Sequence, residues 1–142
     1  MNEPKKLIDT PSQTAGPFLH IGCTPRITGI NIFKSELGLT PFQDISDNEA
    51  INIKGKIYDG NGEPIIDAMI ETWQCDANGK YSSNQGFARI VTDFKTGEYQ
   101  LKTIRPGNEI NTDGSLSASY ITFWIVARGM NRPLITRCLL YT

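Results

Sequence analysis

The stretch GKIYDGNGEPIIDAMIETWQCDANGKY, residues 55–81, alternates short apolar runs with turns rich in glycine, asparagine and aspartate. One run ends at Tyr58, before the Asp-Gly-Asn-Gly of residues 59–62, and the next run spans residues 65–74. A second turn, Asp-Ala-Asn-Gly at residues 76–79, ends that run. Runs of this length between turns of this chemistry are typical of β-strands.

The same pattern continues on both sides of this stretch. Residues 98–104 alternate, with Tyr99, Leu101 and Thr103 on one face, as expected for a strand with one buried face. Residues 120–127 are almost continuously apolar, so we expect this strand to be covered on both faces. Further short runs lie at residues 51–58, 89–94 and 133–141. Together they predict an all-β sandwich.

The two ends of the chain differ from this pattern. Pro11 and Pro17 disfavour a helix, so residues 1–22 are predicted to form an extended arm, with a short helix possible near residues 33–37. Residues 23–142 are expected to form a single sandwich domain. Because the chain stops inside an apolar run, we expect this sandwich to be incomplete at its C-terminus, with its last strands missing. Such a sandwich would depend on a partner chain.

Composition excludes several classes of function. The net charge of −1 gives no electrostatic footprint for nucleic acid, and no apolar run is long enough to span a bilayer. The first residues lack the apolar core of a signal peptide. Three cysteines without metal-like spacing are expected to be reduced thiols, which indicates a cytoplasmic protein.

Four ordered segments resemble the intradiol ring-cleaving dioxygenases. They are TPSQTAGPF at residues 10–18, the stretch 55–81 with its Trp73-Gln74 pair, Phe-Ala-Arg at residues 87–89, and Thr-Ile-Arg-Pro-Gly at residues 103–107. Residues 55–81 are similar to the first hairpin of the family's sandwich. The resemblance covers about the whole chain and implies the intradiol β-sandwich fold, in which two tyrosines and two histidines hold a ferric iron.

The iron ligands implied by the resemblance are largely absent from this chain. The first tyrosine position is kept as Tyr81, whereas the second falls on Glu109 and the two histidine positions on Tyr120 and Thr122. Residues i and i+2 of a strand share a face, so residues 120 and 122 keep the family's spacing without its nitrogen ligands. The one histidine, His20, lies in the arm and is not expected to bind metal. We therefore expect no metal and no catalytic residue in this chain, and Tyr81 to be a buried relic.

Within the family, the chain resembles the alpha-type subunits of protocatechuate 3,4-dioxygenases. This resemblance implies that Fe(III) is held by a beta-type partner subunit, and that the complex cleaves protocatechuate with O₂. It also implies that Thr14, Gly16 and Pro17 of the arm, together with Arg128, form a wall of the substrate pocket. Without a Cβ atom, Gly16 allows the backbone to approach a ligand closely, and an arginine suits a carboxylated substrate.

Alternatives remain open for the residues and for the function. The arm residues could simply fix a turn, Arg128 could be an ordinary surface residue, and Trp73 is expected to be a core residue. Tyr81, Glu109 and Tyr120 could in principle form a degenerate oxygen-rich iron site. The chain could also be a non-catalytic remnant or binding module with the same fold, or a self-sufficient enzyme acting on another catechol.

Overall fold

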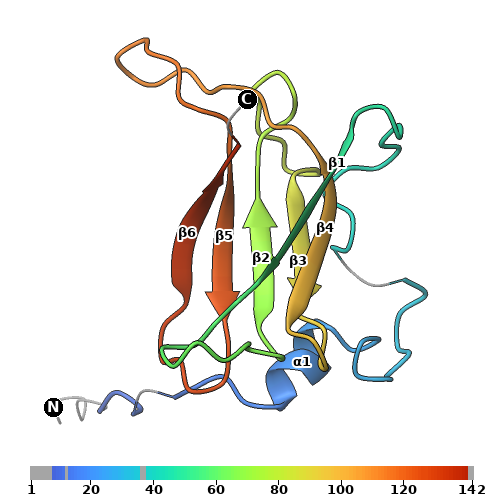
Figure 1. The fold of residues 1–142 in the computed structure, drawn as a ribbon, viewed down its shortest axis with the longest axis vertical. Helices are drawn as coiled ribbons and strands as arrows, with labels where there is room; N and C mark the ends of the chain where they lie inside the picture. Colours follow the sequence, from blue (N-terminus) through green and yellow to red (C-terminus); the bar gives the residue numbers. More distant parts are fainter. Residues whose placement is uncertain (1–7, 12, 36–37, 141–142) are drawn as a thin grey trace, which may run out of the picture.

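A computed structural model describes residues 8–11, 13–35 and 38–140 of the chain. The described part contains one short helix and six strands (Figure 1): α1 (Phe18–Cys23), β1 (Ala50–Lys56), β2 (Met69–Trp73), β3 (Phe87–Val91), β4 (Glu98–Ile104), β5 (Tyr120–Val126) and β6 (Leu134–Leu139). Within these ranges, no helix has the length and apolarity needed to cross a bilayer. The prediction of an all-β protein is confirmed.

Two antiparallel sheets pack face to face. The larger sheet has the strand order β3-β2-β5-β6, and β1 pairs with β4 in a second sheet that crosses in front of it (Figure 1). Leu101 from the smaller sheet joins Ile70, Ile121 and other buried residues of the larger sheet in one core cluster. Tyr99 packs edge to face against Phe123, with ring centroids 6.0 Å apart. This packing is the predicted sandwich.

The strand faces follow the alternation of the sequence. Leu101 and Thr103 of β4 are buried, as predicted, while Gln100 and Lys102 are exposed. The prediction that β5 is covered on both faces is wrong. Residues 121, 123 and 125 are buried, but residues 120, 122 and 124 are only partly covered. In the described part of the chain, the smaller sheet covers one face of β5, and the opposite face remains accessible.

The turn at residues 59–62 does not join a pair of neighbouring strands. It closes a single bridge between Tyr58 and Pro64, after which the chain crosses to the larger sheet. The partner of β1 is β4, and the partners of β2 are β3 and β5. The expected first hairpin is therefore only a local turn between the two sheets.

The arm is not extended along its whole length. Residues 18–22 belong to α1, which corrects the prediction for that part of the arm. The helix begins directly after Pro17, whose φ of −57° is helical, and a proline at a helix start costs no internal hydrogen bond. No helix forms at residues 33–35, and residues 36 and 37 lie outside the described residues.

A buried amide connects the ends of the two sheets. Thr103 Oγ1 donates to Gln74 Oε1 at 2.7 Å, and Gln74 Nε2 donates to the carbonyl of Ile104 at 3.0 Å. The backbone N–H of Gln74 also donates to the carbonyl of Gly86 at 3.0 Å. Gln74 is almost fully buried, so these bonds are needed to offset the cost of removing its amide from water.

Gly86 is predicted to tolerate no side chain. Its φ is +92°, and a Cβ atom there would lie 2.2 Å from the carbonyl oxygen of Gln74. Gly29 is a matched control, because its φ is +85° and an added Cβ would meet nothing within 4 Å. Gly29→Ala should cost about 1–2 kcal/mol for the left-handed backbone alone. Gly86→Ala should cost roughly 3 kcal/mol more, measured by urea unfolding, because the backbone must move. Equal losses would contradict this account of the turn.

Candidate functional site

Three of the four positions implied as iron ligands lie together at one end of the sandwich. Tyr81 lies in the loop after β2, Glu109 in the connection between β4 and β5, and Tyr120 at the start of β5. Tyr81 Oη donates to Glu109 Oε1 at 2.5 Å and lies 3.5 Å from Tyr120 Oη. The structure therefore brings these three oxygen-bearing side chains into one cluster, as the resemblance implied.

Two glycines allow the loops that carry this cluster to approach each other. A Cβ at Gly79 would lie 2.3 Å from the carbonyl oxygen of Asn108, and one at Gly107 would lie 2.5 Å from that of Ala77. The N–H of Gly107 donates to the carbonyl of Asp76 at 2.8 Å. The Asp76 side chain also accepts the N–H groups of residues 78 and 80, which fixes the turn before Tyr81. The loop contact therefore places Tyr81 beside Glu109.

The environment of Tyr81 favours its neutral phenol. Its partial burial, its hydrogen bonds with Glu109 and Tyr120 and the negative charge of Glu109 all raise its pKa well above the ordinary value. The ring stacks on Trp73, with centroids 5.8 Å apart and planes 13° from parallel. Tyr81 is 43% exposed and Trp73 is 37% exposed, so the expectations of a buried relic tyrosine and a core tryptophan are both wrong. Trp73 lies on the outer face because Thr72 and Gln74, its chain neighbours, point inward.

The fourth position, Thr122, lies on the same outer face, one strand away from Trp73. Thr122 pairs with Trp73 on β2 and with Arg137 on β6. Its short side chain lines a shallow hollow of about 290 Å³ with Trp73, Phe87, Trp124 and other residues. Arg137 instead lies over the ring of Tyr120, 4.2 Å from the centroid. Sequence reasoning missed this cation–π contact because nothing along the chain relates residue 137 to residue 120.

The donors of this cluster do not fit the ferric site that the resemblance implies. Such a site needs tyrosinate oxygens and two imidazole nitrogens, whereas the phenol of Tyr81 keeps its proton and donates a hydrogen bond to the carboxylate of Glu109. His20 is buried at the other end of the sandwich, where its Nε2 lies 2.8 Å from the carbonyl oxygen of Asp67. Among the described residues, no group of three or more His, Cys, Asp or Glu side chains could hold a metal ion.

The arm and Arg128 lie together at the opposite end of β5. Ala15 forms a parallel β-bridge with Arg128, so its neighbours Thr14 and Gly16 lie beside that arginine. Thr14 and Pro17 are exposed, and a Cβ added at Gly16 would meet nothing within 4 Å. Nothing in the described part of the chain therefore requires glycine at position 16.

The cluster around Tyr81 lies far from the arm residues and Arg128. Tyr120 begins β5 and Arg128 follows its end, which at the rise of an extended strand separates them by about 25 Å. Figure 1 shows β5 running from the end of the sheet where β6 finishes to the end where the arm and α1 lie. The implied pocket-wall residues and the implied ligand positions of this chain therefore cannot belong to one small-molecule site.

We call the end of the sandwich where the arm and Arg128 lie the arm end. Asp67 is the residue at this end that sequence reasoning missed. Its carboxylate forms an ion pair with Nε of Arg128, and its carbonyl accepts a hydrogen bond from Nε2 of His20. A signal was present, because Asp67 is a single carboxylate inside the apolar run of residues 65–70. Its partner could not be read from the chain, since Arg128 lies 61 positions further on.

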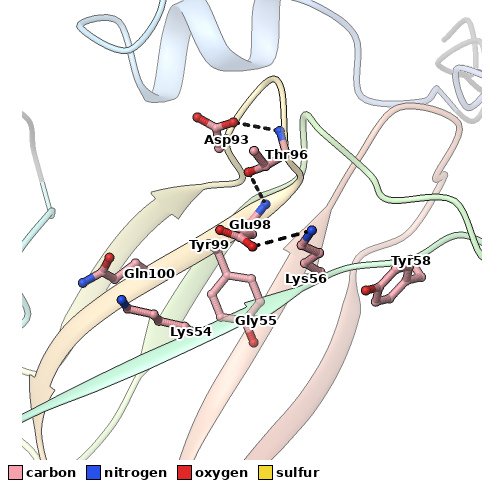
Figure 2. A pocket seen from close by; sticks show the side chains of 9 residues that line it. All are labelled: Lys54, Gly55, Lys56, Tyr58, Asp93, Thr96, Glu98, Tyr99 and Gln100. Atoms are coloured by element: carbon pink, nitrogen blue, oxygen red, sulfur yellow. Dashed lines mark hydrogen bonds and ion pairs between the residues drawn. The ribbon is translucent and has the colours of Figure 1, made fainter.

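A larger hollow than the one beside Thr122 lies elsewhere, on the smaller sheet (Figure 2). It is an open groove of about 700 Å³ on β1 and β4, and none of the predicted site residues lines it. The ring of Tyr99 lies across Gly55, where a Cβ would come within 2.6 Å of the tyrosine oxygen. Lys56 and Glu98 form an ion pair of 3.5 Å at the rim. The charges that line the groove are thus partly compensated, and its lining residues form no cluster of reactive groups.

The phenol of Tyr81 should remain protonated when an ordinary tyrosine ionises. Wild-type protein and Tyr81→Phe differ only in this hydroxyl, so their tyrosinate absorbance should be equal up to about pH 11. Glu109→Gln removes a negative charge that raises the Tyr81 pKa, so an additional tyrosinate should form at lower pH in that variant than in the wild type. A spectrophotometric titration measures both. A tyrosinate that is present in the wild type near pH 10 and lost in Tyr81→Phe would contradict the assignment.

Comparisons with known proteins agree with the fold and show the family of this chain. Residues 34–133 match the family model described as Dioxygenase. The chain is 38% identical over 138 residues to the protocatechuate 3,4-dioxygenase alpha chain of Pseudomonas putida, covering 92% of this chain and 69% of that protein. It is 31% identical over only 71 residues to the protocatechuate 3,4-dioxygenase beta chain of Burkholderia cepacia, covering 42% of this chain and 30% of that one.

A solved structure with the same fold is that of 3-chlorocatechol 1,2-dioxygenase from Rhodococcus opacus 1CP. The TM-score is 0.62 at 22% identity, and the match covers 70% of this chain. The chain spans 47% of the length of that enzyme. The family model covers well over half of the chain, and the alpha chain is similar over nearly all of it. The chain belongs to the intradiol ring-cleaving dioxygenases, an oxidoreductase family whose members in general depend on iron.

Proposed function

We propose that this chain is an alpha-type subunit of a protocatechuate 3,4-dioxygenase. It would assemble with a beta-type subunit, and the complex would insert both atoms of O₂ into protocatechuate. The ring would open between the two hydroxyl-bearing carbons to give 3-carboxy-cis,cis-muconate. In this proposal the present chain supplies part of the pocket wall and the assembly interface, and the beta-type subunit holds the Fe(III).

The observation that carries this proposal is the hydrogen bond between Tyr81 and Glu109. These two residues stand where the family has its two tyrosine ligands, and they satisfy each other instead of presenting two free phenolates. Thr122 offers a hydroxyl where an imidazole would be needed. An iron-binding role for this chain would require that bond to break and a phenol with a raised pKa to ionise.

The arm and Arg128 support the role in the pocket wall. Thr14 and Gly16 flank Ala15, which pairs with Arg128, at a surface about 25 Å from the Tyr81 cluster of the same chain, and Pro17 follows directly in the arm. A ligand held by these residues would therefore belong to a site completed by another chain. The side chain of Arg128 is 63% exposed and could form a charge-assisted hydrogen bond with the carboxylate of protocatechuate.

Reconstitution tests the proposal directly. Oxygen uptake with protocatechuate should be absent for the purified chain and present after co-expression with a beta-type subunit. Iron content and the visible tyrosinate–iron absorption should also appear only with the partner, since the donors of the present chain do not fit Fe(III). A complex that holds iron and gains activity supports the alpha-type role.

The same experiment separates the alternatives. Iron and activity in the isolated chain would indicate a self-sufficient enzyme. Failure to form a complex with a beta-type subunit, without activity in either sample, would favour a non-catalytic remnant or binding module.

Gly16 gives a sharper test of the pocket wall. A leucine at position 16 or at position 22 has room within this chain, because an added Cβ meets nothing within 4 Å at either site. If Gly16 borders the substrate, Gly16→Leu should lower kcat/KM of the reconstituted complex by about tenfold or more, through steric exclusion. Gly22→Leu, as the matched control, should change it less than about twofold. Equal effects of the two variants would remove Gly16 from the pocket wall.

A further inference from the structure

Asp67 lies where three separate parts of the arm end meet. Its carbonyl oxygen is 2.8 Å from Nε2 of His20, which must therefore carry the proton that it donates, and this contact ties α1 to the loop before β2. Its carboxylate forms an ion pair with Nε of Arg128, beyond the end of β5. The Asp67 side chain is 15% exposed and that of Arg128 is 63% exposed. A fixed carboxylate therefore holds the base of an otherwise accessible guanidinium.

The contact with Asp67 leaves most of the guanidinium available. An arginine has five N–H groups, and the shortest contact of the ion pair with Asp67 is made by Nε. Within residues 8–11, 13–35 and 38–140, neither Nη atom of Arg128 makes a hydrogen bond. The two Nη atoms form the end of the fork that can bind a carboxylate with two parallel hydrogen bonds. The structure thus presents a guanidinium whose base is held and whose end is free.

The backbone beneath this side chain is also fixed. Ala15 pairs with Arg128 on one side, and the N–H of Met130 donates to the carbonyl of Ala127 at 3.2 Å across a turn. Gly129 has a φ of +86°, which suits this turn. With its backbone fixed by the turn and its Nε by Asp67, Arg128 loses most of its rotamer freedom before any ligand binds.

We infer that Asp67 is a positioning residue that orients Arg128 toward the carboxylate of the aromatic substrate. The inference rests on the proposed function, because Arg128 meets that substrate only in a site completed by the partner subunit. A guanidinium that is ordered in advance binds with a smaller entropy cost, so Asp67 acts on substrate affinity through Arg128. It also couples this orientation to the arm, since the same residue binds His20 by its carbonyl.

The test uses the complex reconstituted with a beta-type subunit. Asp67→Asn keeps the shape of the side chain and leaves the backbone contact to His20, but it removes the charge that holds Nε of Arg128. KM for protocatechuate should rise about three- to tenfold with kcat changed less than about twofold, as expected for an interaction equally strong in ground and transition states. Arg128→Ala should raise KM further, by about ten- to hundredfold. In the Arg128→Ala background, Asp67→Asn should add little.

Three controls distinguish a positioning role of Asp67 from a purely structural one. Asp47 also pairs with a cation, Lys102, at 3.0 Å, so Asp47→Asn makes the same charge change at another ion pair and should leave KM unchanged. With a catechol that lacks the carboxylate, Asp67→Asn should have no effect on KM. Asp67→Glu restores a carboxylate and should return KM to within about threefold of the wild-type value, which also covers the case in which Asp67→Asn assembles poorly.

The outcomes distinguish a failure of the proposed function from a failure of the inference about Asp67. A KM that is unaffected by Arg128→Ala would overturn the role of Arg128 in the proposed function. A strong effect of Arg128→Ala with none of Asp67→Asn would overturn only the inference. A lower KM in Asp67→Asn would also overturn it, because Asp67 would then merely neutralise the charge that attracts the substrate.

Discussion

The arrangement of this chain depends on the buried amide of Gln74. This side chain bonds to Thr103 and to the carbonyl of Ile104, so it fixes the end of β2 against the end of β4. The loops that leave these two strands must then run side by side, and Gly79 and Gly107 make that approach possible. An unpaired amide at this depth would cost a few kcal/mol, so the register of the two sheets and the loop contact are set together.

That constraint explains the geometry at the Tyr81 end. The loop contact brings a phenol and a carboxylate within hydrogen-bond distance. With Glu109 as its partner, Tyr81 makes this hydrogen bond without a metal. Stacking on Trp73 and the contact of Arg137 with Tyr120 stabilise the same arrangement, in which Tyr81 stays a neutral phenol. The carboxylate of Glu109 is stabilised by the hydrogen bond from Tyr81.

The two ends of β5 thus have different characters. At the Tyr120 end, the polar side chains of the cluster bind one another. At the other end, Arg128, Gly16 and the exposed arm residues face outward. Asp67 is the exception at that end, because it orders both Arg128 and the helix that carries His20. A subunit that contributes to a partner's pocket needs this division, since its contributing residues must be rigid and outward-facing at the same time.

Much of the fold could be predicted from residues alone. The alternation of β4, the positions of the six strands and the Asp/Asn/Gly turns are local properties, set by side-chain period and by backbone sterics. The gathering of Tyr81, Glu109 and Tyr120 followed from the resemblance. The outward position of Trp73, the open face of β5 and the helix after Pro17 were missed, because each depends on which surface another segment covers.

The sequence by itself determined the strands, the turns, the resemblance to the family and the presence of a single histidine, since these rest on residue identity and short-range spacing. Only the tertiary structure decided which strands share a sheet, that Tyr81 donates a hydrogen bond to Glu109, and that Asp67 holds Arg128. The physical reason is that these contacts join residues 28 and 61 positions apart. Their distances are fixed by the packing of two sheets and by a buried amide, and no local pattern in the chain encodes them.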